Sequence, residues 1–272
     1  MRATYNTTYS APVVPSVQVL YELRKNITLR ASVAKGFRSP SLKELYLEFD
    51  DDNHDVFGNK LLIAEKSNHY HASIDWKLKK NKFTFTISPS AFYNDIRNKI
   101  SLVSHNDIYT YLNFYEYITR GGQLTASVKY QGVELSSGYS YTGINNSEVS
   151  AETGYLYASE VNTMLQYKVK KTGTLIAIFW KYNGRQPQYT IDENDDVKVF
   201  NGESYNMADG SITQQLFKNR FTVSTGVKNI LNVTSIKNQD PSGGGTHQAS
   251  EERVFTGMGR NVFVRLQYQF SK

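Results

Sequence analysis

Apolar and polar residues alternate one by one along many segments of the chain, most clearly in the last one. From residue 261 to residue 270, the two alternating sets are Val262, Val264, Leu266, Tyr268 and Phe270 against Arg265, Gln267 and Gln269. A period of two is typical of an extended strand, because successive side chains point to opposite faces. The segment is therefore predicted to be a strand with one apolar face and one polar face.

The same reading predicts about eleven strands along the chain. Several exceed the roughly 5–6 residues usual in globular proteins and reach the roughly 9–11 needed to cross a bilayer at a tilt. No long window has the period of an amphipathic helix. The predicted strands cover residues 16–23, 27–36, 67–79, 82–103, 110–131, 133–143, 156–170, 173–188, 200–217, 219–229 and 259–270.

The connections between these strands alternate in length. Short ones are expected at residues 24–26, 79–81, 131–132, 170–173 and 218–219, and long ones at 37–66, 104–109, 144–155, 189–199 and 230–258. Barrels of the bacterial outer membrane have short periplasmic turns and long external loops. The predicted fold is therefore an all-β transmembrane antiparallel β-barrel in the outer membrane, with the C-terminus in the periplasm. A soluble β-sandwich or β-helix is the alternative.

The strand count leaves two arrangements open. Residues 2–10 could add an outward strand, which would give an independent barrel of about 12 strands. Otherwise the chain forms about half of a barrel of about 22 strands. Met1 is not followed by an apolar leader, so we expect it to lie inside a longer chain.

Composition narrows the possible functions. Aromatic residues make up 13% of the chain, mean hydropathy is −0.50 and the formal net charge is +6. The chain has no cysteine, which excludes disulfides, thiolate metal sites and cysteine nucleophiles. The sequence pI of about 9.2 could indicate nucleic acid, but the basic residues are not gathered in one segment and no recognition motif is present. Nucleic acid is therefore not expected as a partner.

Four motifs occur in an order that resembles the TonB-dependent outer-membrane receptors. Residues 36–40 (Gly-Phe-Arg-Ser-Pro) resemble that family's Gly-Phe-Arg-Ala-Pro box, with Ser39 in place of Ala. Residues 58–67 resemble its Gly-Asn-Pro-x-Leu-x-x-Glu-x-Ser pattern, with Lys60 where Pro is common. Two later segments resemble motifs of two strands of that family's barrel. They are Tyr-Leu-Asn at 111–113 followed by Gly-Gly-Gln-Leu at 121–124, and Val-Lys-Asn-Ile-Leu-Asn at 227–232.

This resemblance implies both an architecture and a function. Residues 1–272 would form the C-terminal portion of the receptor barrel, without the N-terminal plug domain that fills such barrels. The implied partners are that plug, the missing barrel half, the TonB complex reached through the plug, and outer-membrane lipid or lipopolysaccharide. The implied function is import of a scarce nutrient: haem first, a ferric siderophore second, and cobalamin as a further option.

The first two motifs also resemble those of haem receptors, which place a histidine between them. His54 lies between them here, and a neutral imidazole on an external loop can be an axial ligand of haem iron. The competing interpretation is a solvated histidine in an acidic loop. The candidate ligand-binding residues are Phe37, Arg38, Pro40, His54, Asn59, Leu62 and His247.

Other side chains are weaker candidates for ligand binding. The carboxylates Asp50 and Asp52 are oxygen ligands of the kind that Ca²⁺ uses, although their spacing lacks the glycine of an EF-hand loop. His69 and His71 are predicted to face the lumen, as metal or haem ligands or as ordinary polar wall residues. His247 follows a glycine-rich run typical of a mobile external loop.

Two further function classes remain as alternatives to import. A barrel enzyme would need a nucleophile, a base and an orienting group, and no spacing in the chain specifies such a triad. A passive pore or an adhesin is the other alternative. Charged residues expected to line the wet interior are Arg30, Asp75, Lys77, Lys129, Lys168 and Arg265.

Overall fold

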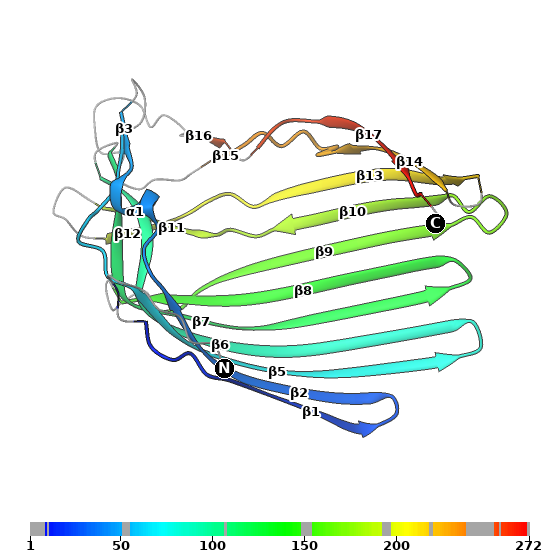
Figure 1. Ribbon diagram of the computed structural model, residues 1–272, viewed down its shortest axis with the longest axis horizontal. Coiled ribbons are helices and arrows are strands. Elements are labelled where there is room, and N and C mark those ends of the chain that lie inside the picture. The colour runs from blue at the N-terminus through cyan, green and yellow to red at the C-terminus, as the bar shows by residue number, and fades with distance from the viewer. Residues whose placement is uncertain are drawn as a thin grey trace.

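Most of the chain folds into one curved, open β-sheet, seen in a computed structural model, and two short strands of a loop form a separate sheet (Figure 1). The structure describes residues 9, 11–50, 55–105, 108–147, 154–191, 197–217, 220–237, 253–255 and 257–270. Eleven strands follow the main path of the sheet, each antiparallel to the next. In order they are β1 (Ser16–Arg24), β2 (Ile27–Arg38), β5 (Glu65–Lys80), β6 (Phe83–His105), β7 (Ile108–Tyr130), β8 (Val133–Asn146), β9 (Leu156–Lys168), β10 (Leu175–Asn183), β13 (Tyr205–Leu216), β14 (Phe221–Lys228) and β17 (Asn261–Tyr268).

These eleven strands correspond one to one with the predicted segments, so the predicted all-β antiparallel fold is confirmed. Figure 1 shows the hairpin turns gathered at one end of the sheet together with the C-terminus. The short helix α1 (Leu42–Tyr46) and the loop strands lie toward the other end. Those loop strands are β3 (Glu48–Phe49), β4 (Asp55–Phe57), β11 (Pro187–Ile191), β12 (Val197–Asn201), β15 (Ser235–Lys237) and β16 (Arg253–Phe255).

The strand register separates the two faces of the sheet. One row of cross-strand neighbours is apolar over six strands, and it runs Leu78, Phe85, Val128, Leu135, Leu165 and Ile178. An adjacent row on the opposite face begins Lys77, Thr86, Ser127 and Ser136. Many large apolar side chains on the first face are exposed, among them Tyr70, Ile74 and Trp76. An exposed apolar face opposite a polar face is the arrangement of a barrel wall with lipid outside and water inside.

Several predicted boundaries were wrong. The connection expected at residues 104–109 is shorter than predicted, because β6 continues to His105, β7 begins at Ile108, and these two residues pair. The strand predicted to end at residue 188 stops at Asn183, and the one predicted to begin at residue 200 starts at Tyr205. In each case the pairing partner decides where a strand ends, and a periodic pattern does not reveal that partner. Most of residues 2–10 lie outside the described residues, so the structure does not test a twelfth strand there.

A small apolar core lies where β6 ends and β7 begins, near the end of the sheet that carries the long loops (the loop end). Val103, Phe114 and Tyr117 are buried, and Ile96 and Ile144 pack against them. Lys99, beside this core, lies 16 residues after the start of β6 at Phe83, where the hairpin turn from β5 ends. This is roughly 50 Å along the strand. Even at a tilt this exceeds the roughly 30 Å hydrocarbon thickness, so the core lies outside the membrane-spanning part.

Within the described ranges, no helix combines the length and the apolar character that crossing a bilayer requires.

Candidate functional site

The loop between β2 and β5 folds back over the ends of β6 and β7, and it begins with a capped helix turn. Ser41 Oγ accepts a hydrogen bond from the Glu44 backbone N–H at 3.2 Å, and a Glu44 carboxylate oxygen accepts from the Ser41 N–H at 2.7 Å. This capping box satisfies two helix donors and starts α1. β4 then runs parallel to β7, with Asp55 opposite Ile108. The described parts of this loop therefore lie against the edge of the sheet at β7.

Arg38 joins this loop to the barrel wall. Its Nη1 donates to both Glu44 oxygens at 2.9 Å, while its Nε and Nη2 donate to Glu65 at 2.9 and 2.7 Å. The hydrogen bonds to Glu65 raise the pKa of Arg38, with Glu44 adding to the effect against partial burial. Burial alone would raise the pKa of Glu44, but its bonds from Ser41 and Arg38 lower that pKa overall. One guanidinium thus holds two carboxylates from different elements.

Glu65 extends this contact into β6. Its Oε1 also accepts the Ile100 backbone N–H at 2.7 Å. The neighbouring Lys99 amine lies over the Tyr117 ring, 3.4 Å from its centroid. Burial lowers the pKa of Lys99 to about 8, because the surrounding core disfavours the charged amine, although Glu65 opposes this shift. The contact between Arg38 and Glu65 therefore lies next to the apolar core, and the Lys99 amine is an ionisable group packed against that core.

Two asparagines bind the rest of the loop to β7. Asn59 Nδ2 donates to the Tyr111 carbonyl at 2.9 Å, and its Oδ1 accepts from the Leu61 N–H at 2.9 Å. Asn113 pairs with the Ile63 backbone, accepting from its N–H at 2.9 Å and donating to its carbonyl at 3.0 Å. Here side-chain amides form the hydrogen bonds to the backbone that a neighbouring strand would otherwise form. The motif segment at residues 58–67 therefore contacts both the segment of Arg38 and the segment of Asn113.

A third anchor holds the loop between β14 and β17. Asn229 is buried and has a left-handed φ of 50°, which Asn adopts more readily than most residues. Its Nδ2 donates to the carbonyls of Val233 and Met258 at 2.9 and 3.1 Å, and its Oδ1 accepts from the Val233 N–H at 3.0 Å. The Asn of the fourth motif thus fastens both ends of this loop.

The inner wall carries a polar network, as expected for the lumen side. Arg30 forms an ion pair with Asp75, which also accepts from Ser88 Oγ at 2.6 Å. His69 Nδ1 contacts Asn94 Oδ1, and the His69 and His71 rings stack with centroids 6.3 Å apart. The predicted placement of these groups on one face is confirmed by the register.

Five of the candidate ligand residues are described in the structure and the others are not. Among the five, Arg38 and Asn59 form hydrogen bonds within the protein, Pro40 and Leu62 are buried, and Phe37 is half-buried. Their role in ligand binding stays a prediction, while their contacts show that they order the loop. His54, Asp52 and His247 lie outside the described residues, and Asp50 is an exposed residue after β3. Among the residues that the structure does describe, no cluster of three His, Asp or Glu could hold a metal ion.

Sequence reasoning missed the partners of these residues. Glu44, Asn113 and Lys99 were not proposed as site residues, and Glu65 appeared only inside a motif. A signal for Glu44 was present, because Ser41 and Glu44 have the spacing of a capping box. Glu65 stands directly opposite Arg38 in the strand register, but a long loop separates the two strands, so the spacing did not reveal the pair.

Comparison with known proteins gives this geometry a context. Residues 2–230 match the family described as "TonB dependent receptor-like, beta-barrel". An iron-regulated outer membrane virulence protein of Vibrio cholerae is 27% identical over 157 residues, which are 52% of this chain and 24% of that protein.

Solved structures show the same fold. A ferric enterobactin receptor of Pseudomonas aeruginosa aligns with TM-score 0.60 and 20% identity, over 94% of this chain and 40% of that one. The FrpB iron transporter of Neisseria meningitidis aligns with TM-score 0.62 and 16% identity, over 96% and 39%. The siderophore receptor PirA of Acinetobacter baumannii aligns with TM-score 0.62 and 16% identity, over 97% and 42%.

Proposed function

The chain belongs to the TonB-dependent receptors, as part of their outer-membrane β-barrel, and from this premise we propose that it serves in the import of ferric siderophores. It lies in the bacterial outer membrane. The chain spans 24% of the length of the curated relative and about two fifths of the solved ones. The import activity is therefore proposed for the receptor that carries this chain.

The observation that carries the proposal is the two-faced sheet with its loops fastened at one end. A wide wall that is polar inside can surround a ligand too large for a simple pore. Arg38, Asn59 and Asn229 hold the described parts of the loops above that wall in defined positions, which supports a selective binding surface there.

The names of the relatives favour iron complexes, and among these a ferric siderophore over haem. Two of the solved relatives cited above are siderophore receptors by name, one of them for ferric enterobactin. The haem hypothesis depends chiefly on His54, which lies outside the described residues. His69, one of the two candidate histidines of the wall, contacts Asn94. The family is one of receptors, so a barrel enzyme has no support from these relatives.

Iron-limited growth tests this proposal. Cells without the receptor and cells with it restored would receive a ferric siderophore, haem or cobalamin in separate cultures, with uptake measured directly as iron for the first two and as cobalt for cobalamin. We expect uptake of the siderophore complex only with the receptor, and its loss when a protonophore abolishes the membrane gradient. Uptake restricted to haem would contradict the ligand assignment. Uptake that survives the protonophore would contradict energised import.

A further inference from the structure

Basic residues gather at the hairpin-turn end of the sheet. The turn between β1 and β2 carries Arg24 and Lys25, and Arg220 follows the turn between β13 and β14. The turns between β5 and β6 and between β9 and β10 carry Lys79, Lys80, Lys82, Lys168, Lys170 and Lys171. All of these side chains are exposed. This end of the wall therefore presents a rim of positive charge to its surroundings.

The rim has few acidic neighbours. Glu22 and Glu134 are the acidic residues on the strand ends next to these turns, and Glu134 is paired with Lys129 at 2.7 Å. At the loop end, by contrast, Arg38 and Arg97 both lie between two carboxylates. Within the described ranges, no ion pair involves the turn residues Lys80 or Lys82. The charge at the turns is available to an external anion.

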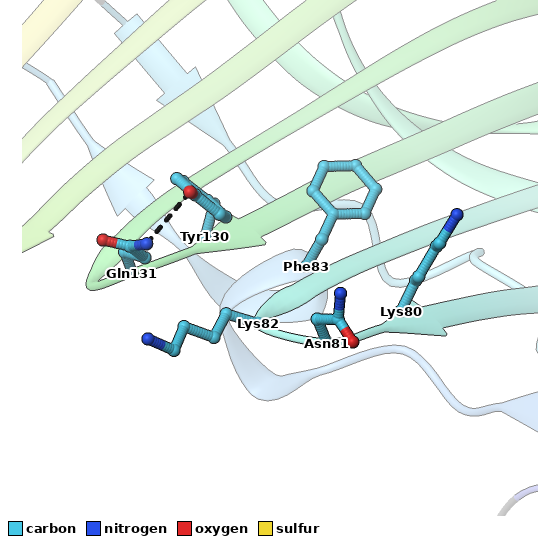
Figure 2. A pocket seen from close by; sticks show the side chains of 6 residues that line it. All are labelled: Lys80, Asn81, Lys82, Phe83, Tyr130 and Gln131. Atoms are coloured by element: carbon cyan, nitrogen blue, oxygen red, sulfur yellow. Dashed lines mark hydrogen bonds between the residues drawn. The ribbon is translucent and has the colours of Figure 1, made fainter.

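A groove of about 580 Å³ lies within this rim, between the turn at residues 81–82 and the start of the next turn. Figure 2 shows Lys80 and Lys82 extending to either side of Phe83, with the Tyr130 ring across the groove. Gln131 Nε2 donates to the Tyr130 hydroxyl at 2.9 Å and fixes that phenol. The groove thus offers two ammonium groups beside two aromatic rings.

The register places this groove at the edge of the lipid-facing side. Lys80, Phe83, Tyr130, Val133 and Tyr167 are consecutive cross-strand neighbours in one row. That row shares its face with the apolar row that contains Leu78 and Phe85, two residues further into the wall. Aromatic side chains in such a position form the interfacial girdle of a membrane barrel. Lys80 therefore reaches outward at the depth of lipid headgroups.

From this juxtaposition we propose that the turn-end groove of Lys80, Lys82, Phe83 and Tyr130 binds the phosphate of an anionic phospholipid in the periplasmic leaflet. The ammonium groups attract the headgroup, and the aromatic rings pack on the glycerol and upper acyl region. The neighbouring basic turns add attraction over a Debye length of about 8 Å at physiological salt. The proposal rests on the membrane placement, and not on the imported ligand.

Native mass spectrometry of the receptor extracted from outer membranes tests this. Phosphatidylglycerol and phosphatidylcholine with the same acyl chains would be titrated separately, because they share a phosphate but differ in net charge. We expect preferential retention of phosphatidylglycerol, weakened by about fivefold for each lysine removed in Lys80→Gln/Lys82→Gln. The matched control Lys43→Gln/Lys60→Gln removes two exposed lysines at the loop end and should retain phosphatidylglycerol as the wild type does.

Salt supplies a readout that needs no variant. Retention of phosphatidylglycerol by the wild-type receptor should fall as sodium chloride rises toward 1 M, where the Debye length is about 3 Å. Equal retention of the two lipids, retention that ignores salt, or equal retention by the two double variants would overturn the proposal. Displacement of the lipid by an acidic periplasmic protein that binds the rim would also overturn the proposal. Siderophore uptake is measured separately, so failure here leaves the import proposal standing.

Discussion

Replacing Arg38 with Gln tests whether one side chain holds the loop between β2 and β5 on the barrel. Arg38 is the cation shared by Glu44 of α1 and Glu65 of β5. Gln keeps much of the side-chain length but removes the charge and the forked donors. Both carboxylates would then lose their cation, although Glu65 would still accept from the Ile100 N–H. The first turn of the loop is expected to detach more often.

The size of the effect follows from exposure. The Arg38 side chain is 43% exposed, and those of Glu44 and Glu65 are 15% and 18% exposed. Solvent-exposed ion pairs contribute about 0–1 kcal/mol, whereas charge-assisted hydrogen bonds contribute about 1.5–3 kcal/mol. For this half-exposed, forked contact we expect a loss of about 2 kcal/mol in local stability, which is a roughly 30-fold rise in the open population.

Hydrogen exchange of residues 41–49, followed by mass spectrometry, measures that population. Arg38→Gln should speed exchange there by about 30-fold and leave β9 and β10 unchanged. Lys43→Gln is the matched control, because it removes a positive charge from α1 itself and should have little effect. Equal exchange in the two variants would refute the reasoning. A double-mutant cycle with Glu65→Gln would then isolate the pair, with an expected coupling of about 1–2 kcal/mol.

Three further predictions concern titration and loop anchoring. The pKa of Glu44 is lower in the folded state than its usual 4.5. The stability that Glu44 contributes is therefore fully present above pH 4.5 and is lost as the pH falls through the lower, folded-state pKa. Hydrogen exchange in residues 41–49, corrected for intrinsic rates, should rise only in that acidic range. Lys99 has a folded pKa of about 8 against 10.5 unfolded, and one pKa unit corresponds to about 1.4 kcal/mol, so Lys99→Met should raise the free energy of urea unfolding at pH 7 by about 3 kcal/mol. The gain should vanish by about pH 10.5, and a gain that stays constant with pH would contradict the assignment. Asn229→Ala removes three hydrogen bonds from a buried left-handed position and should cost about 2–4 kcal/mol in unfolding, whereas the exposed Asn81→Ala, also left-handed, should cost less.

The sequence predicted the wall of this protein well, because the wall repeats one local rule. The long strands alternate largely apolar and polar residues over the part that crosses the membrane, where one face meets lipid and the other meets water. Strand ends above the membrane obey no such rule. β6 and β7 each extend two residues further toward the loop end than predicted, as far as the pair of His105 and Ile108.

The loops were predicted poorly for a different reason. α1 is too short to show a helical period, and the contact between Ser41 and Glu44 starts it. The partners of Arg38 depend on the register of β2 with β5, which a long loop leaves undetermined in the sequence. Motif resemblance singled out Arg38 and Asn59 as ligand-binding candidates, and that role stays a prediction. It did not show that these side chains bind other motif segments, since that is a property of the folded chain.

The measurement that tests the central claim most directly is a nitroxide scan along β5. The chain contains no cysteine, so single cysteines at residues 70–76 can be labelled one at a time in the receptor in bilayers, provided its other segments are also free of cysteine. Collision with lipid-soluble oxygen should peak at positions 70, 72, 74 and 76, and collision with a water-soluble nickel complex should peak at 71, 73 and 75. Two such opposed alternations are what the account predicts. Accessibility with a helical period, or without any alternation, would contradict a lipid-facing outer wall and a watery lumen.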